Sequence, residues 1–114
     1  MLLIQEEWPA RALLKAELED GGWEVLGANT LRLALHLSAA RRFRPNVIVV
    51  DAVGLSADSA ELEALRLLRG RATLLLLQSN QYDPSETTAL APSAVLRRPF
   101  TVGYVADTVK RLQV

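Results

Sequence analysis

A chain of 114 residues, half of them hydrophobic, has room for one domain with one buried core, and we expect a single domain over residues 1–114. Its 13 basic and 13 acidic residues balance, so charge gives no reason to expect nucleic acid or an anionic membrane as a partner. The absence of cysteine excludes disulfides and thiolate metal sites, and the single histidine, His36, excludes a metal cluster built from several histidines.

No segment of the sequence looks like a signal for export or for membrane insertion. The apolar start of the chain is cut short by Gln5, Glu6 and Glu7, which does not fit a signal peptide. Purely apolar runs such as residues 74–77 are far too short to cross a bilayer. We therefore expect a cytoplasmic protein.

Five short segments are predicted to be strands. The segment at residues 23–27 alternates in character, which suits a strand nearer the edge of a sheet. The other four are continuous apolar runs, a pattern that favours strands covered on both faces. These runs lie at residues 2–4, 47–50, 73–77 and 94–96.

Helices are predicted between these strands from leucine, alanine and valine residues at helical spacing. The first has Pro9 in its first turn, where proline is tolerated, and Gly21 and Gly22 end it. A short, weak fourth helix is predicted over residues 84–90. The remaining three each follow a residue whose side-chain oxygen can cap a helix. The capping candidates are Asn29 or Thr30, Asp58 or Ser59, and Thr101.

Strands and helices that alternate in this way predict an α/β fold, a doubly wound parallel sheet of five strands with right-handed crossovers and helices on both faces. Ligand sites in such sheets lie outside the carboxyl ends of the strands. Polar residues follow four of the predicted strands at this edge. They are Glu6 and Glu7, Asp51, Gln78 and Ser79, and Arg98.

The acidic residues at this edge, Glu6, Glu7 and Asp51, are of the type that Mg²⁺ prefers as ligands. A carboxylate beside such a cation can attack a phosphoryl group, and a positive side chain such as Arg98 can offset charge on the transferred oxygens. The same residues permit a second arrangement. In it Arg98 pairs with Asp51, or with Glu6 and Glu7, and holds the pocket together without any cation.

Taken together, these features resemble the receiver domain of bacterial two-component response regulators, the CheY-like domains, over essentially the whole chain. Receivers open with an apolar strand, an acidic pair and often a proline two residues on, as residues 2–9 do here. Their phosphoacceptor aspartate closes the third strand, where this chain has Asp51, and a later acidic residue matches Asp58. Their fifth strand ends in Lys-Pro-Phe, where residues 98–100 read Arg-Pro-Phe, and the resemblance implies a cis bond before this proline.

The chain departs from the receiver pattern at several positions. The family mostly has aspartates in the acidic pair, Thr or Ser at the end of the fourth strand, an aromatic switch residue in the fifth strand, and a lysine after it. In the same order, this chain has Glu6 and Glu7, Gln78 followed by Ser79, Val95, and Arg98.

The resemblance implies a signal-transduction domain and not an enzyme, and the departures favour a degenerate phosphorylation site. Such a domain would act by binding another protein, a sensor kinase or an output protein, or by self-association. The contact surface usual in the family combines the fourth helix, the fifth strand and the fifth helix. On the fifth helix, Asp107, Lys110 and Arg111 are candidates for this contact.

Two other functions remain open. In the first, the receiver is a working phosphoacceptor of a phosphorelay: Asp51 is the nucleophile, Glu6 and Glu7 hold magnesium with it, and Ser79 and Arg98 steady the phosphoryl group. In the second, the chain binds a small molecule on a flavodoxin-like frame, since fold alone does not decide function. No Gly-rich phosphate loop follows the first strand, which counts against this second function.

One basic cluster lies away from the predicted strand ends. Arg41, Arg42 and Arg44 fall at the end of the predicted second helix. Cations at this end complement the helix dipole. We interpret the cluster as a solvated helix end and not as a phosphate-binding patch.

Overall fold

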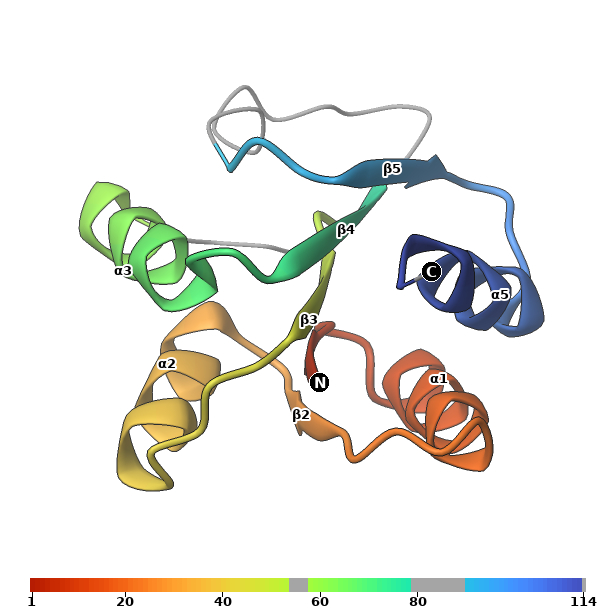
Figure 1. Ribbon diagram of the computed structural model, residues 1–114, viewed down its shortest axis with the longest axis horizontal. Coiled ribbons are helices and arrows are strands. Elements are labelled where there is room, and N and C mark those ends of the chain that lie inside the picture. Colours follow the sequence, from red (N-terminus) through yellow and green to blue (C-terminus); the bar gives the residue numbers. More distant parts are fainter. Residues whose placement is uncertain (54–57, 79–89, 114) are drawn as a thin grey trace.

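The computed structural model describes residues 1–53, 58–78 and 90–113, which build a parallel sheet with helices on both faces (Figure 1). Across the sheet the five strands follow the order β2-β1-β3-β4-β5, and each neighbouring pair is parallel. The predicted doubly wound α/β fold is therefore confirmed. The strands are β1 (Leu2–Ile4), β2 (Leu26–Ala28), β3 (Val47–Asp51), β4 (Thr73–Gln78) and β5 (Ala94–Arg97).

Four helices cover the sheet within the described ranges. Helices α1 (Trp8–Asp20) and α5 (Val102–Leu112) lie together on one face, and α2 (Leu31–Ala40) and α3 (Ser59–Arg69) lie on the other (Figure 1). The helix predicted over residues 84–90 lies outside the described part of the chain, apart from its last residue. Among the helices that are described, none is long and apolar enough to cross a membrane.

Side-chain caps set where three of these helices begin. The side chains of Thr30, Asp58 and Thr101 each accept a hydrogen bond from the backbone N–H three residues further on, at 3.1, 2.7 and 3.0 Å. Each bond satisfies one of the N–H groups that the first helical turn leaves without a partner. Of the predicted alternatives, Thr30 and not Asn29 caps α2, and Asp58 and not Ser59 caps α3.

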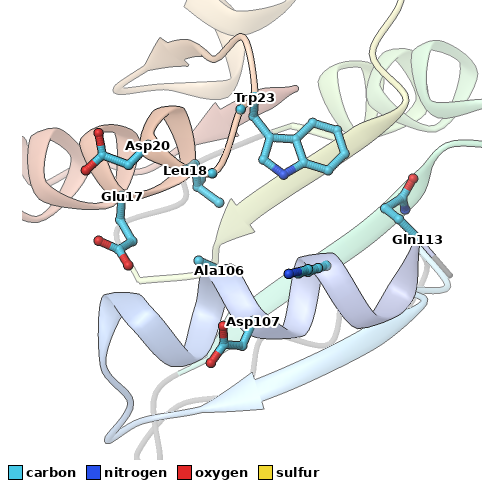
Figure 2. A pocket seen from close by; sticks show the side chains of 10 residues that line it. Glu17, Leu18, Asp20, Trp23, Ala106, Asp107 and Gln113 are labelled. Atoms are coloured by element: carbon cyan, nitrogen blue, oxygen red, sulfur yellow. The ribbon is translucent and has the colours of Figure 1, made fainter.

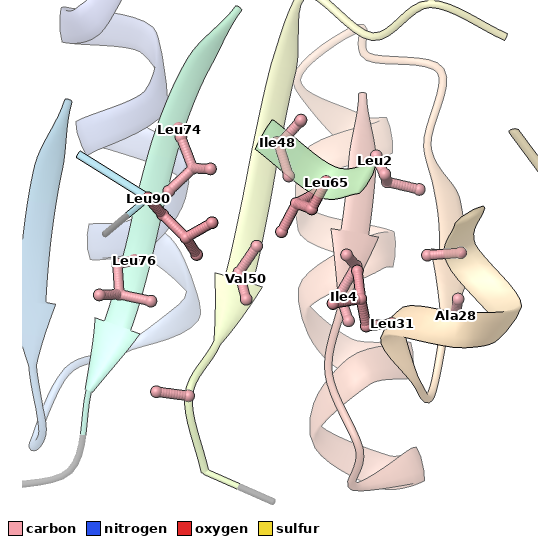
Figure 3. Packing of buried hydrophobic residues seen from close by; sticks show 12 residues of the cluster. Leu2, Ile4, Ala28, Leu31, Ile48, Val50, Leu65, Leu74, Leu76 and Leu90 are labelled. Atoms are coloured by element: carbon pink, nitrogen blue, oxygen red, sulfur yellow. The ribbon is translucent and has the colours of Figure 1, made fainter. Parts of the chain in front are cut away.

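The sheet separates two layers of hydrophobic core, because successive side chains of a strand point to opposite faces. In β3, Ile48 and Val50 belong to the layer beneath α2 and α3, whereas Val49 belongs to the layer beneath α1 and α5. Figure 3 shows the first of these layers, where Leu31 of α2 and Leu65 of α3 lie over the side chains of β1, β3 and β4. We call the two the α2/α3 layer and the α1/α5 layer.

Two strands differ from their predictions. Strand β2 does lie at an edge, but it begins at Leu26 and not at Trp23, which packs against the α1/α5 layer ahead of the strand. Strand β5 was predicted to be covered on both faces, and this is wrong. It is the other edge strand, and Val95 is 40% exposed. A run of three apolar residues does not report the place of a strand in the sheet, and this place decides its burial.

The layered core predicts very different effects for two leucines. Leu75 lies in β4 and is fully buried, whereas Leu67 on α3 is 70% exposed. Leu75→Ala should lower the free energy of unfolding by about 3 kcal/mol, because it leaves a cavity between packed side chains. Leu67→Ala should change it by less than about 0.5 kcal/mol. Urea unfolding followed by circular dichroism measures both, and equal losses would contradict the assignment of Leu75 to the core.

Candidate functional site

Three polar side chains from three strand ends meet on one face of the sheet. Gln5 follows β1, Asp51 ends β3, and Arg98 follows β5. Each comes two positions after a residue of the α1/α5 layer, so the alternation of side chains directs all three toward that face. The preceding residues of that layer are Leu3, Val49 and Leu96.

Asp51 is the centre of this group. Asp51 is only 3% exposed, and both of its carboxylate oxygens accept hydrogen bonds. Oδ1 accepts from the backbone N–H of Val53 at 2.9 Å and from Nη1 of Arg98 at 3.2 Å. Oδ2 accepts from Nε2 of Gln5 at 2.9 Å and from Nη2 of Arg98, the second half of a bidentate ion pair. A carboxylate has about four lone-pair sites, so these donors fill its capacity.

Arg98 is fixed from three sides. Its guanidinium group holds Asp51 and lies 5.0 Å from the ring centroid of Phe100, within the range of a cation–π contact. Its backbone N–H donates to the carbonyl of Gln78 at 2.9 Å, which joins the end of β4 to the segment after β5. The bond between Arg98 and Pro99 is cis, as the resemblance to receivers implies.

Gln5 cannot be recognised as a site residue from the sequence, where it only ends an apolar run. The register between β1 and β3 pairs Ile4 with Val50, so the next residues, Gln5 and Asp51, are neighbours on one face. Gln5 is 4% exposed, and its Oε1 has no hydrogen-bond partner among the described residues. Because an amide donates a hydrogen bond where a second carboxylate would repel Asp51, Gln5 stabilises the buried charge.

The structure does not bring Glu6 and Glu7 into this group. Both are exposed in the turn before α1, where the side chain of Arg11 donates to the backbone carbonyls of Gln5 and Glu6 at 2.8 and 3.1 Å. No three acidic or histidine side chains of the described residues lie close enough to hold a metal ion. The arrangement does not fit a divalent cation, because nitrogen donors already occupy the Asp51 oxygens. Metal binding by Glu6, Glu7 and Asp51 stays a prediction that this structure does not support.

The two candidate residues at the end of β4 are Gln78 and Ser79, and only Gln78 belongs to the described residues. Gln78 follows Leu74 and Leu76, which belong to the α2/α3 layer, so the alternation places it on the face opposite to Asp51. Ser79 lies outside the described residues, and its contact with a phosphoryl group stays a prediction.

The chain is similar in sequence to a curated protein. No protein-family model matches the chain. The KDP operon transcriptional regulatory protein KdpE of Escherichia coli (strain K12) is 32% identical over an alignment of 107 residues, and the match covers 90% of this chain and 46% of KdpE. The chain thus spans about half the length of this curated relative.

Solved structures are similar over nearly the whole chain. The chemotaxis response regulator CheY4 of Vibrio cholerae has a TM-score of 0.72 and 24% identity, over 97% of this chain and 95% of that one. The CheY-like response regulator receiver domain protein of Methanospirillum hungatei JF-1 has a TM-score of 0.76 and 13% identity, over 97% and 90%. The chain is a CheY-like receiver domain. The predicted family, fold and class of signal-transduction domain are confirmed.

Within this receiver domain, the predicted ion pair between Arg98 and Asp51 is present. Arginine differs from lysine at such a place, because its planar fork of donors binds both oxygens of one carboxylate at once. Asp51 is 3% exposed and Arg98 is 34% exposed by their side chains, so the pair lies at the boundary between interior and solvent. Asp51 depends on this contact more than Arg98 does, because a buried charge without a partner is costly.

A double-mutant cycle tests this dependence. Arg98→Met should lower the free energy of unfolding by about 2 kcal/mol, because it leaves the Asp51 carboxylate buried without its cation. Asp51→Asn combined with Arg98→Met should cost less than the sum of the single changes by at least about 1 kcal/mol. Arg71→Met, at an exposed arginine, serves as the control and should have little effect. Strictly additive losses would show that the two side chains do not support each other.

Proposed function

We propose that this receiver domain is a cytoplasmic signalling module that works without phosphorylation of Asp51, by binding another protein or a second copy of itself rather than by catalysis. The observation that carries this proposal is the bidentate contact between Arg98 and the buried Asp51. A carboxylate acts as a nucleophile only through an oxygen that can reach the phosphoryl group. Here both oxygens already accept two hydrogen bonds each.

The two residues that bind Asp51 through their side chains also weaken the attraction for a cation. Gln5 brings an amide where a carboxylate would add negative charge, and Arg98 brings a full positive charge onto the same oxygens. A hard cation such as Mg²⁺ needs oxygen ligands and would have to displace these donors. The charge of Asp51 is thus balanced within the protein, and phosphorylation chemistry loses both its metal and its free nucleophile.

Signalling through contacts requires a binding surface, and the β5–α5 side offers one. It exposes three large hydrophobic residues, and the charged candidates of α5 lie on the same helix. Exposed apolar side chains with charged neighbours are common at protein interfaces. The hydrophobic residues are Val95, Val102 and Tyr104, with exposures of 40%, 37% and 48%, and the charged residues are Asp107, Lys110 and Arg111.

The relative KdpE is by its name a transcriptional regulatory protein, and this chain spans about half of it. We infer that the receiver likewise passes its state to an output protein or domain. Because the proposal places no phosphoryl group on Asp51, the signal would depend on which partner is bound, and the affinity of each partner would set the response.

Intact-mass measurement with a small phosphodonor tests the proposal. After incubation with acetyl phosphate and millimolar magnesium, the parent receiver should carry no phosphoryl adduct, because Arg98 and Gln5 occupy Asp51. The double variant Gln5→Asp with Arg98→Lys should acquire one, since it places a second carboxylate beside Asp51 and replaces the bidentate guanidinium group by a point charge. Adding Asp51→Asn to that variant should abolish the adduct and serves as its control.

A single adduct on the parent that Asp51→Asn removes would overturn the proposal. The working phosphoacceptor, with Glu6, Glu7 and Asp51 as magnesium ligands and Ser79 and Arg98 at the phosphoryl group, would then be the better description. A magnesium titration followed by tryptophan fluorescence gives a second readout, because Trp8 is 68% exposed and adjoins Glu7. The parent should give no saturable response, and the double variant should give one.

A further inference from the structure

A groove lies between the ends of α2 and α3, and the function proposed above does not use it. Its volume is about 620 Å³. Arg44 in its wall stands shortly before β3 begins, whereas Asp51 is the last residue of β3. The groove therefore lies at the amino edge of the sheet, opposite to the edge that holds the Asp51 group. Six of its nine lining residues are apolar: Leu35, Ala39, Phe43, Ala64, Leu67 and Leu68.

The polar lining of this groove carries charge of one sign only. Arg42 and Arg44 line it and are exposed, and no carboxylate does. Neither guanidinium group makes an ion pair or side-chain hydrogen bond within the part of the chain that the structure describes. An apolar groove beside two unpaired cations is complementary to a ligand that combines apolar groups with negative charge.

Backbone hydrogen bonds satisfy several carbonyl groups at the end of α2. The carbonyl groups of residues 37–39 accept hydrogen bonds from the backbone N–H groups of residues 41–43 at 3.0, 2.8 and 3.2 Å. These bonds occupy carbonyls that a helix end otherwise presents to solvent. Arg41, Arg42 and Arg44 are all exposed just beyond the end of α2, as expected for a solvated helix end, and Arg42 and Arg44 also line the groove.

A second observation at the groove is independent of charge. Ser38, in the last turn of α2, lines the groove and is 3% exposed. Its hydroxyl has no hydrogen-bond partner among the residues that the structure describes. A buried hydroxyl without a partner is uncommon in folded proteins. A carboxylate or carbonyl that entered between the helices would offer this hydroxyl an acceptor.

The groove between α1 and α5 lacks such complementarity. It has a volume of about 560 Å³, and Figure 2 shows Glu17 and Asp20 of α1, Asp107 of α5 and the indole of Trp23 around it. Lys110 also lines it, so charges of both signs meet there. No single ligand chemistry follows from this mixture.

We propose that the groove between α2 and α3 docks an acidic, apolar segment of a partner protein. Leucine-like side chains would fill the groove, and carboxylates of the segment would pair with Arg42 and Arg44. A protein segment fits better than a small molecule, because small-molecule sites enclose most of their ligand, whereas Leu67 in this wall is 70% exposed. An amphipathic helix laid into an apolar groove is a common mode of peptide recognition.

Two synthetic peptides of equal length test this docking. Both carry the same leucines on an alanine background, with glutamate on the polar positions of one and lysine on those of the other. The glutamate peptide should shift the amide NMR signals of groove residues and bind about tenfold more tightly than the lysine peptide, and added salt should weaken it. Arg42→Glu with Arg44→Glu should weaken the glutamate peptide by about tenfold or more.

Matched variants separate the groove from general charge and from the Asp51 group. Arg32→Glu with Lys15→Glu makes the same change in net charge at surface residues outside the groove and should leave binding nearly unchanged. Asp51→Asn should also leave it unchanged, so this test does not depend on the phosphorylation test. Equal binding of both peptides, absence of binding, or equal losses in the two charge-reversal variants would overturn the proposal. Decanoate shifting the groove signals while the glutamate peptide does not would assign the groove to small amphiphiles instead.

Discussion

A buried carboxylate must be paired, and in this receiver domain Asp51 is held by two residues that follow other strands. The bidentate contact with Arg98 joins the segment after the edge strand β5 to the end of the central strand β3, and the bond from Gln5 adds β1. The strand ends at the carboxyl edge are therefore held by polar contacts as well as by the sheet. Removing the guanidinium group of Arg98 would leave the carboxylate of Asp51 buried without a cation. This loss costs more free energy of unfolding than the ion pair itself contributes.

Gln5 and Arg98 act together at this site. With an amide at Gln5 and a guanidinium group at Arg98, Asp51 is the only carboxylate of the group, and one cation balances it. A carboxylate in place of Gln5 would leave a second negative charge beside Asp51 that a single arginine does not neutralise, and this surplus is what attracts a divalent metal. The amide of Gln5 and the single positive charge of Arg98 together give a neutral, hydrogen-bonded pocket around Asp51.

The sequence predicts most of the fold, because four continuous apolar runs, several capping residues and helical spacing point to the same topology. It also places Asp51 and Arg98 at one edge of the sheet, where their ion pair is one of the arrangements that the sequence permits. It does not predict Gln5, because a polar residue after an apolar run looks like an exit from the core until the register between β1 and β3 is known. The edge position of β5 cannot be predicted from the sequence for a similar reason, because strand order depends on pairing between segments far apart in the chain.

The two edges of the sheet differ in what they leave unsatisfied. At the carboxyl edge, hydrogen bonds fill both oxygens of Asp51, so little free energy remains there for a ligand to gain. At the amino edge, Arg42 and Arg44 lack partners within the described residues and border an apolar groove. A ligand changes a protein's state only through contacts that differ between states. For a receiver whose aspartate is already neutralised, the groove between α2 and α3 is therefore the place where binding has most to gain.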